Sequence, residues 1–93
     1  MIRKYKNRPV HKIEEAIRFE YSNKGLQELM DFCGLAFVSS NKNRHIGAIG
    51  KAVLYLDGLK SIVFEGDYVT KDEEGKLHIM PREYFVNVYE EIE

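Results

Sequence analysis

Turn-forming residues divide the second half of the chain into short runs, and this spacing strongly constrains the fold. Asp57-Gly58, Glu65-Gly66-Asp67 and the segment 72–75 each interrupt apolar or β-branched sequence. Glycine and aspartate favour such turns because glycine accepts a positive φ and aspartate can bond its own turn backbone. Short runs between turns pair as antiparallel hairpins. The sequence therefore predicts strands over 52–56, 59–64, 68–71 and 76–80.

A helix is predicted over residues 24–33. Its apolar residues recur at the i, i+3, i+4, i+7 spacing that places them on one helix face. Ser22 or Asn23 can cap the first turn, and Gly34 lies where a left-handed residue commonly ends a helix. The apolar positions are Leu26, Leu29, Met30 and either Phe32 or Cys33.

Residues 10–21 fit two structures. Ile13, Ile17 and Tyr21 lie four residues apart, as on a helix face, but they also fit the two-residue period of a strand. β-Branched and aromatic residues dominate the second half of this segment, which favours a strand over 16–21. A further short strand is predicted over 36–39.

The C-terminal segment begins with residues that suit the first turn of a helix. Pro81 fits that turn, and the carboxylate of Glu83 is favoured there by the helix dipole. A short helix is therefore predicted over 81–87, although 88–92 also fits a last strand. Together these elements predict an α+β fold in one domain, 1–93. We expect a small, mostly antiparallel sheet of five or six strands with one main helix (about 24–33) and one short C-terminal helix (about 81–87).

Composition excludes several classes of protein. The chain has 93 residues, 44% of them hydrophobic, and a formal net charge of −1. This balance differs from that of disordered chains, of strongly basic nucleic-acid-binding domains and of strongly acidic DNA mimics. The single cysteine, Cys33, cannot form an intrachain disulfide, and no apolar run approaches the roughly 20 residues of a membrane span. We expect no membrane association and a cytoplasmic location.

No catalytic or metal-binding constellation is apparent, so we expect neither an enzyme nor a cofactor. His11, His45 and His78 lack the spacing of zinc motifs, and Cys33 lies on or beside the apolar stripe of the predicted helix. The segment 47–51 is glycine-rich but lacks the spacing of a phosphate-binding loop. The adjacent glutamates at 14–15, 73–74 and 90–91 are expected to be solvated.

Charge is distributed unevenly between the two ends of the chain. Residues 1–12 contain five basic side chains and no acidic one, whereas 83–93 contain four glutamates and no basic one. One interpretation is a basic arm that contacts phosphates with Tyr5 interleaved. The favoured interpretation is that the two ends are neighbouring strands with opposite charges paired across them. The arm's candidate binding residues are Arg3, Lys4, Tyr5, Lys6 and Arg8, which Lys42 and Arg44 could extend.

Two segments together resemble small proteins of tailed phages and prophages. The first is Lys4-Tyr5-Lys6-Asn7-Arg8-Pro9-Val10 followed by Glu15-Ala16-Ile17-Arg18-Phe19, and the second is Gly66-Asp67-Tyr68 followed by Gly75, Pro81, Phe85 and Tyr89-Glu90. The resemblance covers both ends and about half of the chain, and residues 36–64 lie outside it. It implies an accessory protein of a mobile element, located in a bacterial cytoplasm, and it supplies no catalytic residue.

Three functions follow as hypotheses. The leading one is a non-enzymatic protein that binds a host or phage protein, such as a bacterial defence component of the CRISPR effector kind. The second is a nucleic-acid-binding accessory protein that uses the basic arm. The third is a nucleotide-binding homodimer with sites at 47–51 and at Gly66-Asp67. For Gly66, Asp67 and Tyr68, a structural role in a turn is favoured over a ligand site.

Overall fold

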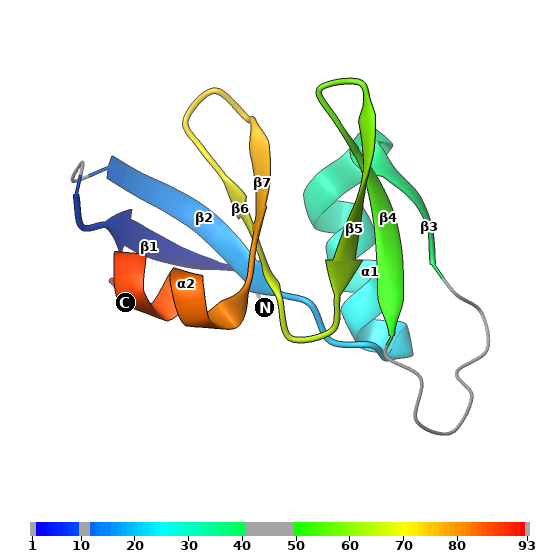
Figure 1. Ribbon diagram of the computed structural model, residues 1–93, viewed down its shortest axis with the longest axis horizontal. Helices are drawn as coiled ribbons and strands as arrows, with labels where there is room; N and C mark the ends of the chain where they lie inside the picture. The colour runs from blue at the N-terminus through cyan, green and yellow to red at the C-terminus, as the bar shows by residue number, and fades with distance from the viewer. Residues whose placement is uncertain (1, 10–11, 41–49, 93) are drawn as a thin grey trace.

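The computed structural model describes residues 2–9, 12–40 and 50–92 and shows an α+β fold with two antiparallel sheets (Figure 1). Five strands form one sheet in the order β7-β6-β2-β1-β8, and three form the other in the order β3-β4-β5. The strands are β1 (Arg3–Asn7), β2 (Lys12–Arg18), β3 (Phe37–Ser40), β4 (Lys51–Leu56), β5 (Leu59–Phe64), β6 (Tyr68–Lys71), β7 (Leu77–Met80) and β8 (Tyr89–Glu91). The predicted α+β class and antiparallel pairing are confirmed, with the strands divided between two sheets.

The main helix α1 (Asn23–Cys33) connects β2 of the five-stranded sheet to the segment that leads into β3 of the three-stranded sheet. Ser22 is its N-cap, and the Ser22 hydroxyl accepts a hydrogen bond of 2.9 Å from the Gly25 N–H. Gly34 ends the helix with a φ of 59° and donates its N–H to the Met30 carbonyl. The predicted cap, extent and end of this helix are therefore confirmed. Met30 itself is largely exposed, so it lies outside the buried stripe.

Removing the N-cap is expected to destabilise the domain modestly. In a Ser22→Ala variant the Gly25 N–H loses its side-chain acceptor, and such losses cost about 1 kcal/mol. Urea unfolding followed by circular dichroism should show this decrease in the free energy of unfolding. Ser22→Asp, which restores an acceptor, should stay close to wild type, whereas equal loss in both variants would contradict the capping role.

Strand β2 (Lys12–Arg18) lies earlier in the chain than the strand predicted over 16–21. It begins at Lys12, because Lys12 to Ala16 pair with β1, and it ends at Arg18. Beyond Arg18, Phe19 still donates its N–H to the Asp67 carbonyl and accepts from the Gly66 N–H, both at 2.8 Å, before the chain reaches the start of α1. The prediction of a strand in this segment is thus confirmed, but its boundaries were set too late in the chain.

Two apolar clusters form the core, one on each face of the five-stranded sheet. The first lies between the two sheets and α1, which Figure 1 shows against the three-stranded sheet. The second lies beneath α2 (Arg82–Val88), at the other end of the molecule. The buried members of the first cluster are Ile17, Phe19, Leu29, Phe32, Cys33, Ala52, Leu54, Val63 and Val69, and those of the second are Ala16, Phe85 and Tyr89.

The C-terminal segment contains both of the predicted alternatives in succession. Helix α2 ends at Val88, and β8 follows at once and pairs with β1. Pro81 is the N-cap of α2 and not its first helical residue. The sequence could not separate helix from strand here, because the β1 edge that attracts β8 is about 80 residues away in the chain.

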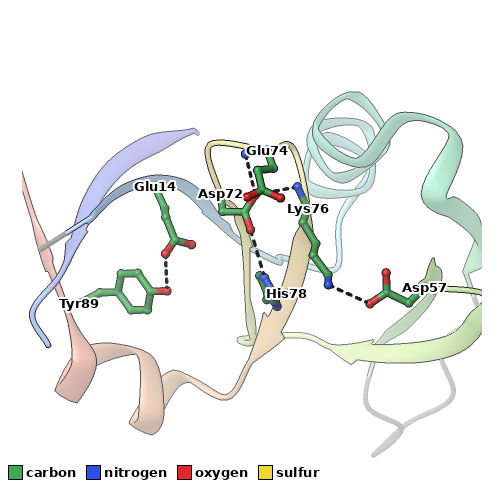
Figure 2. A network of polar contacts seen from close by, with 7 residues as sticks. All are labelled: Glu14, Asp57, Asp72, Glu74, Lys76, His78 and Tyr89. Atoms are coloured by element: carbon green, nitrogen blue, oxygen red, sulfur yellow. Dashed lines mark hydrogen bonds and ion pairs between the residues drawn. The ribbon is translucent and has the colours of Figure 1, made fainter. Parts of the chain in front are cut away.

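Asp72 organises the turn between β6 and β7 (Figure 2). One of its carboxylate oxygens accepts hydrogen bonds of 2.9 Å from the N–H groups of both Glu74 and Lys76. The other lies 3.6 Å from Nε2 of His78. The backbone hydrogen bond from Lys76, more than any other contact, lowers the pKa of Asp72. Lys76 in turn lies 3.5 Å from Asp57, which links this turn to the β4–β5 hairpin.

The contribution of Asp72 to stability is expected to depend on pH. Because its pKa is lower in the folded state than in the unfolded state, ionised Asp72 stabilises the fold above its ordinary pKa. That contribution is lost as the pH falls through the folded-state pKa. The melting temperature of Asp72→Asn should therefore lie below that of wild type at neutral pH, and the gap should narrow below about pH 4. A gap that stays constant with pH would contradict this role.

Candidate binding surfaces

The basic residues of the N-terminal arm lie on two opposite faces of the five-stranded sheet. Tyr5 belongs to the apolar cluster beneath α2. Because side chains alternate along a strand, Arg3 points to the same face as Tyr5, whereas Lys4 and Lys6 point to the other. The predicted arm therefore does not present its charges on a single surface.

The two ends of the chain are neighbouring strands, as the favoured interpretation predicts. β1 and β8 pair in antiparallel register, with Tyr5 opposite Glu91 and Lys6 opposite Glu90. An Arg3 Nη atom donates to a Glu91 carboxylate oxygen at 2.5 Å, and this hydrogen bond is the main reason that the pKa of Arg3 is raised. Arg8 donates to the backbone carbonyl of Asn87 at 3.0 Å. Arg3 and Arg8 thus help to hold the C-terminal segment.

Gly66, Asp67 and Tyr68 have the structural roles that their sequence favours. Gly66 has a φ of 96°, and its N–H donates to the Phe19 carbonyl at 2.8 Å. The Asp67 carboxylate accepts from the Phe64 N–H at 3.0 Å, which closes the turn. Tyr68 is the first residue of β6. Lys42 and Arg44, the proposed extension of the basic surface, lie outside the described residues.

Four aromatic rings pack together beneath α2. Phe85 stacks on Tyr68 with a centroid distance of 4.0 Å and on Tyr89 with one of 4.7 Å, and both pairs of rings are within 10° of parallel. Tyr5 meets Phe85 edge to face at 4.7 Å. Phe85 is therefore the central ring of a Tyr68–Phe85–Tyr89 stack, which we call the aromatic stack.

A cleft of about 340 Å³ opens beside the aromatic stack. It brings together Arg3, Tyr5 and Tyr68, which the sequence placed in two separate candidate sites. It also contains Arg18, which the sequence did not single out, although the two-residue period of β2 predicts that Arg18 shares a face with Ala16. The cleft is lined by Arg3, Tyr5, Ala16, Arg18, Glu20, Tyr68 and Glu91.

Glu14 is buried, so the prediction that it is solvated is wrong. Its side chain is 9% exposed, and one carboxylate oxygen accepts a hydrogen bond of 3.0 Å from the Tyr89 hydroxyl (Figure 2). The other oxygen has no hydrogen-bond partner within the described residues, and the completely buried Thr70 hydroxyl also lacks one of ordinary geometry there. Burial raises the pKa of Tyr89, and its contact with Glu14 adds to this effect.

The remaining reactive side chains are Cys33 and the potential metal ligands. Cys33 is buried, as predicted, and burial raises its pKa to about 11, so the reactive thiolate is scarce at neutral pH. No group of three or more potential metal ligands is found among residues 2–9, 12–40 and 50–92. Of the glycine-rich segment 47–51, only Gly50 and Lys51 are described, and a side chain at Gly50 would meet the Tyr21 ring within 2.2 Å.

The outward face of the three-stranded sheet carries apolar side chains that no described element covers. Ala52, Leu54 and Val63 point into the core, so the alternate residues of β4 and β5 point outward. Tyr55, Ile62 and Phe64 are 49%, 50% and 41% exposed. We call this surface the outer face, and it comprises Lys51, Val53 and Tyr55 of β4 with Lys60, Ile62 and Phe64 of β5.

Sequence reasoning did not identify the outer face as a site. The signal was present, since β4 and β5 carry apolar residues at consecutive positions and so on both faces of the sheet. Such strands usually lie between two layers of structure. Only the arrangement in space shows that α1 covers one face and that no described element packs on the other.

No helix within the described residues is long and apolar enough to cross a membrane. Comparison with family models, with curated proteins and with solved structures finds no match to this chain.

Proposed function

We propose that this chain is a non-enzymatic binding protein that docks a protein partner on its outer face. The observation that carries the proposal is the apolar group of Val53, Tyr55, Ile62 and Phe64, which no described element covers. Three of these residues are about half exposed. Contiguous exposed apolar side chains with a charged rim are typical of protein-interaction surfaces. Aromatic residues are also enriched at such surfaces, because they bury a large area when they bind.

Charge on the outer face indicates the chemistry of the partner. Lys51 and Lys60 lie at opposite ends of the apolar group, opposite Phe64 and Tyr55 in the strand register. None of the six residues of the outer face is acidic. A second copy docked on the same face would therefore bring its own lysines to a surface that has no acidic residue of its own. A different protein, with an apolar centre and acidic residues around it, fits the surface better.

The resemblance of both chain ends to small phage and prophage proteins supports a proposal for the origin of this protein and for the class of its partner. We propose an accessory protein of a phage or prophage that acts in the bacterial cytoplasm on a host or phage protein. A component of bacterial defence, such as a CRISPR effector, belongs to this class of partner. The alternative of a nucleic-acid-binding arm has less support, since Arg3 and Lys4 point to opposite faces.

Affinity capture with matched variants tests the proposal. Tagged wild-type protein, Ile62→Asp and Val86→Asp are each incubated with the lysate of a bacterial host at micromolar concentration. Ile62 is 50% exposed on the outer face and Val86 is 43% exposed on α2, so both substitutions place a charge on a similarly accessible residue. A true partner should be retained by wild type and by Val86→Asp and lost from Ile62→Asp. Equal retention by all three proteins would exclude the outer face.

A further inference from the structure

We infer that the cleft beside the aromatic stack is a binding site for a ribonucleoside monophosphate. This site is distinct from the outer face and from the segments 47–51 and 66–67, where the sequence suggested nucleotide binding. It lies on the α2 side of the five-stranded sheet, whereas the outer face belongs to the other sheet.

One small residue, Ala16, stands among the larger side chains that line the cleft. Ala16 of β2 is opposite Arg3 on β1 and opposite Thr70 on β6, so it is the centre of a three-strand row. Ala16 is 1% exposed, and the larger Tyr5 and Tyr68 side chains, which also line the cleft, meet edge to face with their ring centroids 6.4 Å apart. The cleft volume of about 340 Å³ is near the lower end of the range for ligand pockets, which suits a single nucleotide.

The aromatic stack ends at the cleft. Phe85 covers one face of the Tyr68 ring at 4.0 Å, so the cleft is lined by the remaining face or edges of that ring. A planar base placed there would extend the existing order of Tyr89, Phe85 and Tyr68 by one ring. Stacking of a base on an aromatic side chain contributes about 1–3 kcal/mol and tolerates any base.

The polar groups of the cleft match the phosphate and the ribose, which are the other two parts of a nucleotide. The Arg18 side chain makes no hydrogen bond or ion pair within the described residues, and its guanidinium offers the paired donors that phosphate accepts. Arg18 pairs with Tyr68 in the strand register, so the two side chains lie on the same face. The Glu20 carboxylate is an acceptor for ribose hydroxyls, as acidic residues are in other nucleotide sites.

The charge of the cleft favours one phosphate group over three. Arg3 is already paired with Glu91 at 2.5 Å. Arg18 and Glu20 are the charged side chains of the cleft that have no ion-pair partner among the described residues. A triphosphate would bring several more negative charges to a rim that is close to neutral. We therefore expect monophosphates to bind more tightly than triphosphates.

An NMR titration tests the inference directly. ¹⁵N-labelled wild-type protein is titrated at low salt with AMP, GMP, CMP and UMP, and separately with ATP, inorganic phosphate and short single-stranded RNA. We expect at least one monophosphate to shift the amide signals of Ala16, Arg18 and Tyr68 at ligand concentrations up to about 1 mM. Inorganic phosphate should bind at least about tenfold more weakly, because it lacks the base that stacks.

Variants assign the binding to the cleft. Arg18→Gln should weaken monophosphate binding by about tenfold or more. Arg82→Gln removes an exposed arginine from α2, outside the cleft, and should change binding by less than about twofold. Both variants should fold like wild type, because neither side chain makes a hydrogen bond or ion pair among the described residues. Thermal melting checks this expectation.

Four results would overturn the inference. They are the absence of any shift with all four monophosphates, unchanged affinity in Arg18→Gln, equal binding of inorganic phosphate, and tighter binding of ATP than of the monophosphates. RNA that binds more than about tenfold tighter than every monophosphate would assign the cleft to nucleic acid instead. None of these results bears on the outer face, whose test uses different variants.

Discussion

Replacing Phe85 with alanine is expected to lower the free energy of unfolding by about 3–5 kcal/mol, the range found for buried phenylalanine truncations. Phe85 is 2% exposed and is the central ring of the aromatic stack. Its loss removes two stacked contacts and the edge-to-face contact with Tyr5, and it leaves a cavity that β1 and β6 cannot fill without moving. Small domains have total stabilities of about 5–15 kcal/mol, so this loss is a large fraction of the total.

The neighbouring residue provides the control for this prediction. Tyr84 precedes Phe85 in α2 but is 56% exposed, so Tyr84→Ala should change the stability by less than about 0.5 kcal/mol. Urea unfolding followed by circular dichroism measures both variants. A similar loss in Tyr84→Ala and Phe85→Ala would contradict the central role of Phe85 in the aromatic stack, because alanine does not itself lower helix propensity.

Removing the hydrogen bond between Tyr89 and Glu14 is expected to have the next largest effect on the free energy of unfolding. Tyr89→Phe keeps the ring in the stack but removes the hydroxyl that donates to the buried Glu14 carboxyl group at 3.0 Å. The other Glu14 oxygen already lacks a partner within the described residues. Hydrogen bonds to charged groups contribute about 1.5–3 kcal/mol to stability. We therefore expect the free energy of unfolding to fall by an amount in this range.

A double-mutant cycle separates this hydrogen bond from packing. Glu14→Leu alone should also destabilise the domain, because the Tyr89 hydroxyl is then buried without its acceptor. The double variant Glu14→Leu/Tyr89→Phe replaces both polar partners with apolar groups and should recover much of the loss. Strictly additive losses would show that the two groups are not coupled.

Local chemistry explains which parts of the fold could be predicted from the sequence. The turn at Asp57-Gly58 has positive φ angles of 51° and 80°, as a two-residue hairpin turn of this sequence requires. Helix α1 has its cap at Ser22 and its end at Gly34, and both depend on residues within a few positions. Features determined by neighbours in sequence were therefore predicted well.

Most features determined by distant neighbours were not predicted. Glu14 is buried because Tyr89, far along the chain, comes back beside it when β8 pairs with β1. The division into two sheets likewise depends on where α1 packs, which no single segment encodes. Alternation along β2 does indicate that Glu14 and Glu15 face opposite ways, but it does not indicate which face will be covered.

The same distinction applies to the candidate sites. The charge asymmetry of the chain ends correctly predicted that they are paired strands, because complementary charges recur along both. The cleft required the structure, since Arg18 and Tyr68 meet only through the pairing of β2 with β6. The outer face required it too, because its exposure depends on which side of the three-stranded sheet α1 occupies.

Site-specific photo-crosslinking tests the outer face most directly. A photoreactive phenylalanine analogue is placed at Tyr55 on the outer face or at Tyr84 on α2, two tyrosines of similar exposure, 49% and 56%. The proposal predicts a discrete crosslinked protein from position 55 in host lysate, suppressed by excess unlabelled wild type but not by excess Ile62→Asp. Crosslinks of equal yield from both positions, or none from position 55 that wild type can suppress, would contradict it.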